Sequence, residues 1–222
     1  MARIEVGALR AVLWDLDGTL ADSSEFHWQA WQEALGAEGL EVTRAEFLAS
    51  FGQRNDTILS KWLGPGPDAE RIQRVGEAKE AHYRTLVDRE GISPLPGAAE
   101  WVTALHEAGW RQAIASSAPR LNVEVMHRAL GFSGLIETLV AAEDVHRGKP
   151  DPEVFLVAAN RLGVPPNRCV VVEDAEAGIE AARRAEMRSV GVGGGAVTSA
   201  DRVVRFLTEL EPGAFEQLVE EE

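Results

Sequence analysis

Cysteine is nearly absent from this chain of 222 residues, in which Cys169 is the only one. A lone cysteine can neither close an internal disulfide nor share a zinc ion with a second cysteine, so neither kind of cross-link is expected. Runs of about 18 apolar residues are also missing, and Glu5 interrupts the stretch where a secretory signal would need an apolar core. The sequence therefore predicts a protein of the reducing cytoplasm with no membrane partner.

Positive charge is scarce as well. Lys and Arg number 22 against 36 Asp and Glu, which gives a formal net charge of −14. This surplus opposes non-specific binding to nucleic acid or to anionic membranes, so we expect no nucleic-acid partner. An acidic protein that nevertheless binds an anion must gather a few cations or a metal ion at one place.

The sequence does contain a series of short apolar runs rich in Val, Ile and Leu, each followed by a longer stretch of helical periodicity. The runs are residues 11–14, 112–115, 139–142, 169–172 and 189–192. This alternation is typical of a parallel sheet flanked by helices. The predicted fold class is therefore α/β, a doubly wound parallel sheet, and the 45% of apolar residues suffice to bury its core.

One interval is too long for this alternation. Roughly a hundred residues separate the first two runs, far more than one crossover helix needs, and most of them have helical rather than strand periodicity. We therefore predict an inserted α-helical cap domain over residues 22–94. The α/β core domain would then consist of residues 1–21 and 95–222.

Polar residues follow three of the apolar runs at the point where each strand should end. These residues are Asp15 with Asp17, Ser116 with Ser117, and Glu173 with Asp174. In a doubly wound sheet the ligand site lies beyond the carboxyl ends of the strands, so these side chains should meet at one rim. Crowded carboxylates repel one another unless a cation lies among them, and hard oxygen ligands suit Mg²⁺. The sequence therefore predicts a magnesium site at this rim.

Each of these features also has a plainer interpretation. The segment Asp15-Leu16-Asp17-Gly18, taken alone, is at least as typical of a solvated turn. Ser116 and Ser117 could cap the following helix instead of binding phosphate. Lys149 lies in a loop before a helix, where a cation and backbone N–H groups could meet an anion, but an isolated lysine often only adds solubility.

Four motifs, in this order and spacing, resemble the haloacid dehalogenase superfamily. They are Asp15-Leu16-Asp17-Gly18-Thr19-Leu20, Ser116, Gly148-Lys149-Pro150, and Glu173-Asp174 with Ala177-Gly178-Ile179. The chain is similar to the phosphatase and β-phosphoglucomutase branch, in which a helical cap is inserted directly after the first motif. The resemblance covers nearly the whole chain, apart from the first few residues and the C-terminal tail.

The resemblance implies a catalytic role for several residues. Asp15 would be the nucleophile that forms an aspartyl-phosphate, since a carboxylate is already ionised at neutral pH. Asp17 would protonate the leaving oxygen and then deprotonate the attacking water or hydroxyl. Ser116, Ser117 and Lys149 would bind the oxygens of the transferring phosphoryl group.

The resemblance also implies a ligand set for the metal. Mg²⁺ would lie between the Asp15 carboxylate, the main-chain carbonyl of Asp17 and Asp174, with Glu173 in support. Two residues outside this set depart from the family pattern. Thr19 stands where β-phosphoglucomutases typically carry an aliphatic residue, a choice commoner among the phosphatases. Glu186 stands where the family usually has glycine, which should affect the turn before the last strand rather than catalysis.

Three residues of the predicted cap resemble substrate contacts of the family: His27, Arg54 and Lys79. Arg54 falls where members of the family can bind a second phosphate. Each residue has a plainer interpretation: His27 as a histidine at a helix start, Arg54 as a surface residue, and Lys79 as one partner of an ion pair on a solvated helix.

These features favour a magnesium-dependent phosphohydrolase that acts on a small phosphorylated metabolite, in particular a sugar phosphate, as a monomer or weak homodimer. The alternative is a β-phosphoglucomutase-like isomerase, in which a sugar hydroxyl instead of water attacks the phosphorylated aspartate. A third, remote interpretation is a non-enzymatic phosphate-responsive domain. Receiver domains of that kind have no helical insertion and no second aspartate in the place of Asp17.

Overall fold

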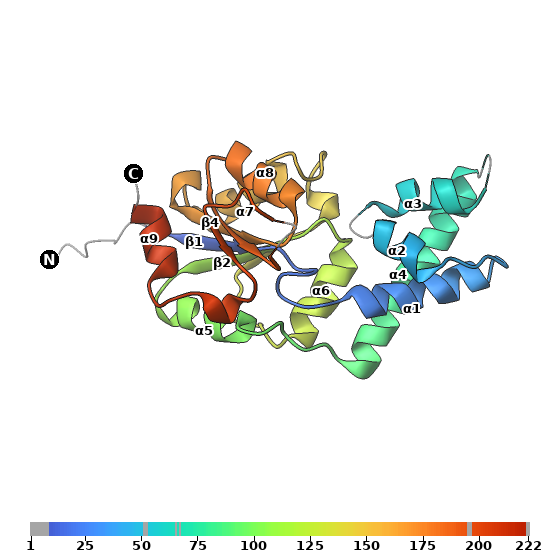
Figure 1. The fold of residues 1–222 in the computed structure, drawn as a ribbon, viewed down its shortest axis with the longest axis horizontal. Helices are drawn as coiled ribbons and strands as arrows, with labels where there is room; N and C mark the ends of the chain where they lie inside the picture. Colours follow the sequence, from blue (N-terminus) through green and yellow to red (C-terminus); the bar gives the residue numbers. More distant parts are fainter. Residues whose placement is uncertain (1–8, 51–52, 65, 67, 195–196, 221–222) are drawn as a thin grey trace, which may run out of the picture. The chain divides into compact units, whose positions relative to one another are not determined.

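The computed structural model describes residues 9–50, 53–64, 66, 68–194 and 197–220. The chain divides into two compact units (Figure 1). One, the core unit, comprises Met1–Asp22 and Ser93–Glu222, and the other, the helical unit, comprises Ser23–Ile92. None of the described helices is both long enough and apolar enough to cross a membrane.

The core unit is built on a sheet of six parallel strands in the order β3-β2-β1-β4-β5-β6. The strands are β1 (Ala11–Trp14), β2 (Arg111–Ala115), β3 (Thr138–Val140), β4 (Cys169–Glu173), β5 (Arg188–Val192) and β6 (Arg202–Val204). The predicted doubly wound parallel sheet is confirmed. The sequence did not predict β6, because this short edge strand is only partly buried and carries no apolar run.

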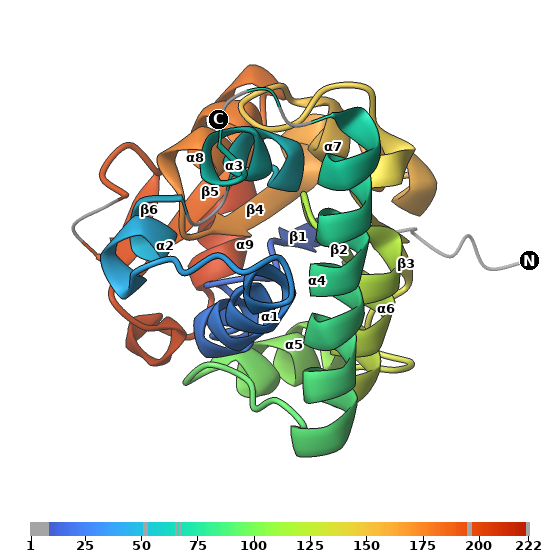
Figure 2. The same cartoon turned by 90° about the vertical axis from the view of Figure 1, so that its right-hand side faces the viewer.

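Helices cover both faces of this sheet (Figures 1 and 2). On one face lie α7 (Glu153–Leu162) and α8 (Glu176–Arg184), which share an apolar core with alternate residues of the strands, such as Leu13, Ala113 and Val171. On the other face lie α5 (Ala98–Glu107) and α9 (Ala214–Glu220), where Trp14 packs against Phe215. Central strands are thus buried on both sides, which explains why they read as continuous apolar runs.

Helices α7 and α8 of the core unit are each followed by a residue in the left-handed backbone conformation. Gly163 caps α7 in the left-handed conformation, with φ of 65°. Helix α8 ends in the same way with a non-glycine residue: Glu186 has φ of 58°, its N–H donates to the Arg183 carbonyl, and the Met187 N–H donates to the Ala182 carbonyl. This pair of hydrogen bonds is the Schellman arrangement, in which glycine is the preferred residue. The departure at Glu186 therefore lies in a turn before β5.

The helical unit contains α1 (Ser24–Gly36), α2 (Arg44–Ser50), α3 (Asn55–Trp62) and α4 (Ala69–Glu90). Helices α1 and α4 pack against each other, and aromatic and aliphatic side chains fill the interior, among them Trp31, Phe47 and Leu59. Helix α4 begins at a true N-cap, because the Asp68 carboxylate accepts a hydrogen bond of 2.6 Å from the Arg71 N–H. This unit has its own apolar core, separate from that of the sheet.

Candidate active site

Three neighbouring strands, β2, β1 and β4, deliver the polar residues to one rim of the core unit. Trp14 at the end of β1 pairs with Ile114 of β2 and with Val172 of β4. The ladder continues one residue beyond β1, because the Asp15 N–H donates to the Val172 carbonyl at 2.9 Å. The register therefore places Asp15 between the ends of β2 and β4, as expected for a ligand site in this fold.

Lys149 joins two carboxylates at this rim. Its Nζ lies 2.5 Å from Asp15 Oδ1 and 2.7 Å from Glu173 Oε2. The side chains of Lys149 and Glu173 are only 9% and 2% exposed, so both charges lie largely out of water. The structure thus brings the lysine of the third motif into contact with residues of the first and fourth motifs. Buried charges of this kind are retained only where they are paired.

Glu173 is fixed from two sides. Its Oε1 accepts hydrogen bonds of 3.1 Å from the backbone N–H groups of Asp174 and Ala175, while Oε2 accepts from Lys149. The first turn of α8 leaves room for this carboxylate because it carries Gly178, where an added Cβ would lie 1.9 Å from Glu173 Oε2. Glycine at this position is therefore a steric requirement of the buried glutamate.

Asp174 occupies a space that a second glycine leaves open. Gly18, at φ of 89°, turns the chain after Asp17, and its N–H donates to the Ala21 carbonyl at 2.8 Å. A Cβ at Gly18 would lie 2.1 Å from Asp174 Oδ2. The tight turn and the carboxylate therefore depend on the same missing side chain. Asp17 itself is half-buried within this turn.

The pKa values of the site reflect crowded negative charge. Burial raises the pKa of Asp15 well above its ordinary value, and the charge of Glu173 raises it further. Burial and the charge of Glu173 likewise raise the pKa of Asp174 to about 7. Burial by itself lowers the pKa of Lys149, but the charges of Asp15 and Glu173 outweigh this effect and hold the pKa above its ordinary value. The lysine is therefore charged at neutral pH.

These residues fit a hard divalent cation. Carboxylate oxygens of Asp15, Glu173 and Asp174 lie within 4.8 Å of one another, the one such group of metal-binding side chains among the described residues. Three carboxylates face the single cation of Lys149, which leaves an excess of negative charge in a buried place. Oxygen donors with this excess suit Mg²⁺ better than softer metals.

The two serines after β2 differ in their surroundings. Ser116 is buried, its N–H donates to the Val140 carbonyl at 3.0 Å, and its Oγ accepts from the Ala118 N–H at 3.0 Å. Ser117 is exposed to solvent. The Oγ contact of Ser116 is a local turn and not a helix cap, because the N-cap of the following helix is Pro119 and no side chain caps it, so the plainer interpretation of the serines as helix caps is wrong. Its hydroxyl hydrogen can still donate, so the contact does not prevent binding to a phosphate oxygen.

The three cap residues named from the sequence do not form one group within the helical unit. Lys79 Nζ lies 2.9 Å from His27 Nδ1 and 2.8 Å from Glu80 Oε1, and the His27 ring stacks on Tyr83. Arg54 instead forms an ion pair with Asp56 at 3.2 Å, and its side chain is 80% exposed. Lys79 is only 3% exposed, so the interpretation as a solvated helix lysine is wrong.

Sequence reasoning missed two members of the Lys79 group. Glu80 Oε1 accepts from both Lys79 and Asn55, the latter at 2.6 Å, which ties α4 to the start of α3. Neither residue belongs to a motif, and a charged pair at adjacent helix positions does not normally share one face. No local pattern in the sequence therefore marked either residue.

Comparisons with known proteins show the family to which the chain belongs. The family model for haloacid dehalogenase-like hydrolases matches residues 9–186. A fructose-1-phosphate phosphatase of Escherichia coli is 34% identical over 183 residues, which cover 82% of this chain and 95% of the relative. The β-phosphoglucomutase of Bacillus subtilis is 33% identical over 212 residues, covering 91% and 92%.

The chain is also similar to a solved structure and to part of a longer protein. The crystal structure of CbbY from Rhodobacter sphaeroides in complex with phosphate has a TM-score of 0.84 and 28% identity, covering 94% of this chain and 99% of that one. The chloroplastic protein SUPPRESSOR OF QUENCHING 1 of Arabidopsis thaliana is 36% identical over 194 residues, but the chain spans only 18% of its length. The chain belongs to the haloacid dehalogenase-like hydrolase family, an enzyme family with a phosphatase and a phosphoglucomutase among these relatives.

Proposed function

We propose that this protein is a magnesium-dependent phosphatase that hydrolyses a small phosphorylated metabolite, in particular a sugar phosphate, through a phosphorylated Asp15. The observation that carries the proposal is the buried Asp15 at the end of the central strand, bonded to Lys149 and surrounded by the carboxylates of Glu173 and Asp174. Its relatives act on sugar phosphates, one of them as a fructose-1-phosphate phosphatase.

Two aspartates perform the chemical steps of this proposal. An oxygen of Asp15 attacks phosphorus, and as the new P–O bond forms, the bond to the leaving oxygen breaks. Asp17 gives its proton to that leaving oxygen. Asp17 then removes a proton from water, whose oxygen attacks the same phosphorus, releasing inorganic phosphate and restoring Asp15.

The phosphoryl group carries negative charge into a site that is already acidic, and Lys149 offsets part of that charge. In the described contacts its Nζ bonds to Asp15 and Glu173, so the cation stands beside the nucleophile. We propose that Ser116 and Ser117 donate hydrogen bonds to the phosphoryl oxygens from the neighbouring strand end. Donors fixed before the reaction stabilise developing charge better than water does.

The metal in this proposal would be held by the carboxylates of Asp15 and Asp174 and the main-chain carbonyl of Asp17, with Glu173 in support. When bound, Mg²⁺ supplies positive charge against the phosphoryl oxygens and so lets two anions approach each other. Glu173 is held by Lys149 and by two backbone N–H groups, so its part is to hold the shape and charge of the cluster.

The test is a phosphate-release assay on a panel of sugar phosphates with Mg²⁺, with EDTA, and with an Asp15→Asn variant. We expect Asp15→Asn to lower turnover by at least about a thousandfold, because the amide cannot act as the nucleophile. Asp201→Asn is the matched control, since this carboxylate binds Ser189 and Arg188 on the β5–β6 side of the sheet. Near-normal turnover of Asp15→Asn, or activity that survives EDTA, would reject the proposal.

A mutase is the second candidate, and the 33% identity with a β-phosphoglucomutase favours it. The two activities differ in whether water or a sugar hydroxyl attacks the phosphorylated Asp15. The assay that separates them supplies β-glucose 1-phosphate with catalytic glucose 1,6-bisphosphate and follows free phosphate and glucose 6-phosphate together. Glucose 6-phosphate with little free phosphate would establish the mutase.

The cap residues enter this second candidate as proposed substrate contacts. A mutase must bind a bisphosphate at both ends, and the exposed Arg54 is the proposed contact for the far phosphate. His27 and Lys79, which contact each other at 2.9 Å, are the proposed sugar contacts. Arg54→Ala should therefore lower mutase activity more than hydrolysis of small substrates, and equal losses in the two assays would contradict that role.

We further propose a cytoplasmic enzyme that works as a monomer or weak homodimer. Support comes from the single buried Cys169, which needs no oxidising compartment. Size-exclusion chromatography over a range of protein concentrations would test the oligomeric state, and a stable larger assembly would contradict it.

A further inference from the structure

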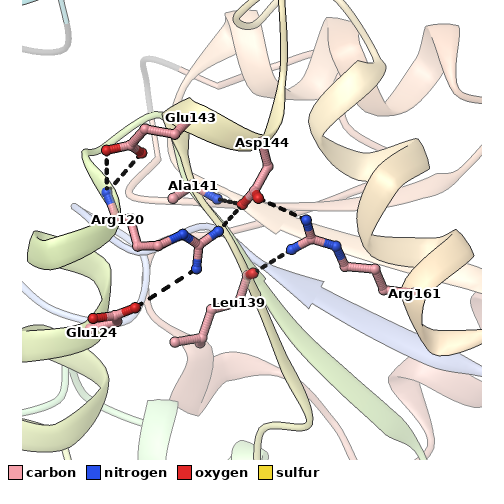
Figure 3. Close-up of polar contacts among 7 residues, drawn as sticks. All are labelled: Arg120, Glu124, Leu139, Ala141, Glu143, Asp144 and Arg161. Atoms are coloured by element: carbon pink, nitrogen blue, oxygen red, sulfur yellow. Dashed lines mark hydrogen bonds and ion pairs between the residues drawn. The ribbon is translucent and has the colours of Figure 1, made fainter.

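Asp144 is the centre of a polar cluster at the edge of the sheet beside β3 (Figure 3). It ends the short helix η1 (Ala142–Asp144), and its side chain is only 14% exposed. One carboxylate oxygen accepts from the Ala141 N–H at 2.8 Å and from the Arg120 guanidinium, while the other accepts from Arg161 at 2.7 Å. Arginines from two different helices therefore share one carboxylate.

Arg120 connects this cluster to the loop between β2 and α6 (Arg120–Ala129), residues 116–119, which carries Ser116 and is called the serine loop below. Arg120 is the first residue of α6, and its N–H donates to Glu143 at 2.8 Å. Two backbone bonds join the same segments, from Ser116 N–H to the Val140 carbonyl and from Ala142 N–H to the Ala118 carbonyl, each 3.0 Å. The position of Ser116 is thus set by the segment that contains Asp144.

Arg161 connects the cluster to the loop between η1 and α7, residues 145–152, which carries Lys149 and is called the lysine loop below. Arg161 lies in α7 and donates to Asp144 and to the Leu139 carbonyl at 2.8 Å, so the helix is fixed to β3. The loop that carries Lys149 runs from η1 to the start of α7, where Glu153 accepts from the Arg147 N–H at 3.0 Å. Both ends of the Lys149 loop are therefore attached to elements that Asp144 joins.

We propose that Asp144 is a positioning residue that holds the serine loop and the lysine loop in register, so that Ser116 and Lys149 meet the same phosphoryl group. This inference rests on the proposed phosphate-binding role of those two residues. Asp144 itself is separated from them by Arg120, Ala141 and the η1 backbone. It acts through the placement of other groups, and small displacements of such groups weaken binding strongly.

Charge matters in this arrangement as well as shape. Burial alone would raise the pKa of Asp144, but the hydrogen bonds from Arg161 and Ala141 and the charge of Arg120 lower it below its ordinary value. Asparagine at this position would keep the acceptor for Ala141 but lose the charge that two guanidinium groups share. Exposed single ion pairs contribute little, whereas a shared and largely buried carboxylate fixes geometry.

The experiment compares Asp144→Asn with Glu137→Gln. Glu137 is also bound by an arginine, Arg111, at 2.9 Å, but it lies before β3, at the opposite end of that strand. Binding of inorganic phosphate to the Mg²⁺-loaded protein is measured by calorimetry, together with kcat/KM, the Mg²⁺ concentration for half-activation, and Tm. Phosphate binding is measured without turnover, so it reports on positioning even where no substrate is hydrolysed.

We expect Asp144→Asn to weaken phosphate binding and lower kcat/KM by roughly tenfold each, while the Mg²⁺ requirement stays within about twofold. Glu137→Gln should change Tm but neither binding nor kcat/KM. Arg161→Gln, which leaves the Arg120 bond in place, should weaken phosphate binding by roughly threefold and covers the case in which Asp144→Asn fails to fold.

Phosphate affinity within about twofold of the wild type in folded Asp144→Asn or Arg161→Gln would overturn the positioning role, even if Tm fell. Absence of phosphate binding to the wild-type protein would overturn it too. Wild-type protein that binds phosphate tightly but hydrolyses no sugar phosphate would reject the proposed function alone, and the comparison of affinities would still decide the inference.

Discussion

The core unit and the helical unit each bury a lysine, and the two lysines have opposite surroundings. Lys149 contacts two carboxylates, with a third close by, and so lies in an excess of negative charge. The contacts described for Lys79 are one carboxylate, Glu80, an imidazole, His27, and the rings of Trp31 and Tyr83. Both lysines are buried, but among the described contacts the carboxylates outnumber the ammonium group only around Lys149.

This difference separates a site that needs a cation from one that does not. A buried carboxylate without compensation raises its own pKa or recruits a positive ion. Asp15 and Asp174 have raised pKa values, which is the expected condition of the cluster before a metal binds. In the helical unit, the Glu80 carboxylate pairs with Lys79, and the rings of Trp31 and Tyr83 add a cation–π contribution.

The largest expected effects come from replacing each of the two lysines by methionine. Lys149→Met should lower phosphatase turnover by at least about a hundredfold, because the phosphoryl charge loses its nearest cation. Both Lys149→Met and Lys79→Met should destabilise the protein by about 3 kcal/mol, since each removes the positive charge that pairs with a buried carboxylate. Turnover, and Tm with and without Mg²⁺, are measured for both.

The metal distinguishes the two variants. Added Mg²⁺ should recover part of the Tm lost in Lys149→Met, because it can replace a positive charge in the acidic cluster, and none of the Tm lost in Lys79→Met. Equal recovery in both variants, or a smaller turnover loss for Lys149→Met than for Lys79→Met, would remove the distinction between the two buried lysines.

A glycine in each unit gives the next largest contrast. Alanine at Gly178 would place Cβ against the Glu173 carboxylate, at a distance no real contact shows, so Gly178→Ala should cost about 2 kcal/mol and weaken Mg²⁺ binding. Gly76 of α4 has ordinary contact distances of 3.6 Å and more, so Gly76→Ala should stabilise by about 0.5–1 kcal/mol. Chemical denaturation measures both, and stabilisation by Gly178→Ala would contradict the steric argument.

The pH dependence of stability should show the acidic cluster directly. Asp174 has a folded-state pKa of about 7, above its ordinary value near 4, so the metal-free folded protein holds protons that the unfolded chain releases. This contribution to stability is complete below pH 4 and is lost as the pH rises through 7. Without metal we expect a loss of about 2–3 kcal/mol between pH 5 and pH 8.

Mg²⁺ should remove most of this pH dependence, because it takes the place of the protons. Thermal unfolding across this pH range, in EDTA and in Mg²⁺, provides the measurement. Stability that rises with pH in EDTA would show that the carboxylates of the cluster are stabilised as anions even without metal.

The smallest expected effect comes from relieving the backbone strain at Glu186, which lies away from the acidic cluster. Glu186 has φ of 58°, a conformation that favours glycine, and it lies outside the acidic cluster. Glu186→Gly should raise stability by about 0.5 kcal/mol, since relief of strain exceeds the greater flexibility of the unfolded glycine chain. Turnover should not change, and a loss of turnover would place this turn within the catalytic machinery.

Much of the fold was predictable because buried parallel strands are continuous apolar runs in the sequence. Residues 11–14 and 169–172 are apolar on both faces of the sheet, and the polar residues that follow them had to lie at one rim. The edge strand β6 shows no such run, because it is only three residues long and none of the three is fully buried. Likewise, the burial of Lys79 depends on how α1 packs on α4, and no local pattern contains that packing.

Within the site, the sequence predicted which residues gather but not how they contact. The motifs named Asp15, Lys149, Glu173 and Asp174. That one lysine bridges Asp15 and Glu173 depends on the path of a long loop. The need for Gly178 comes from the direction of the Glu173 side chain, which only the placed helix α8 reveals. The link from Asp144 to Ser116 was invisible, because it passes through backbone groups of η1.

The strand order also fixes when, during synthesis, the site can exist. Strand β1 is made first, yet it pairs with β2 and with β4, whose residues come much later in the chain. The acidic cluster of Asp15, Glu173 and Asp174 is therefore incomplete until the ribosome has passed residue 174, whereas the helical unit consists of the earlier residues Ser23–Ile92. Distant pairing forms slowly. The residues of the helical unit are thus all synthesised well before those of the acidic cluster.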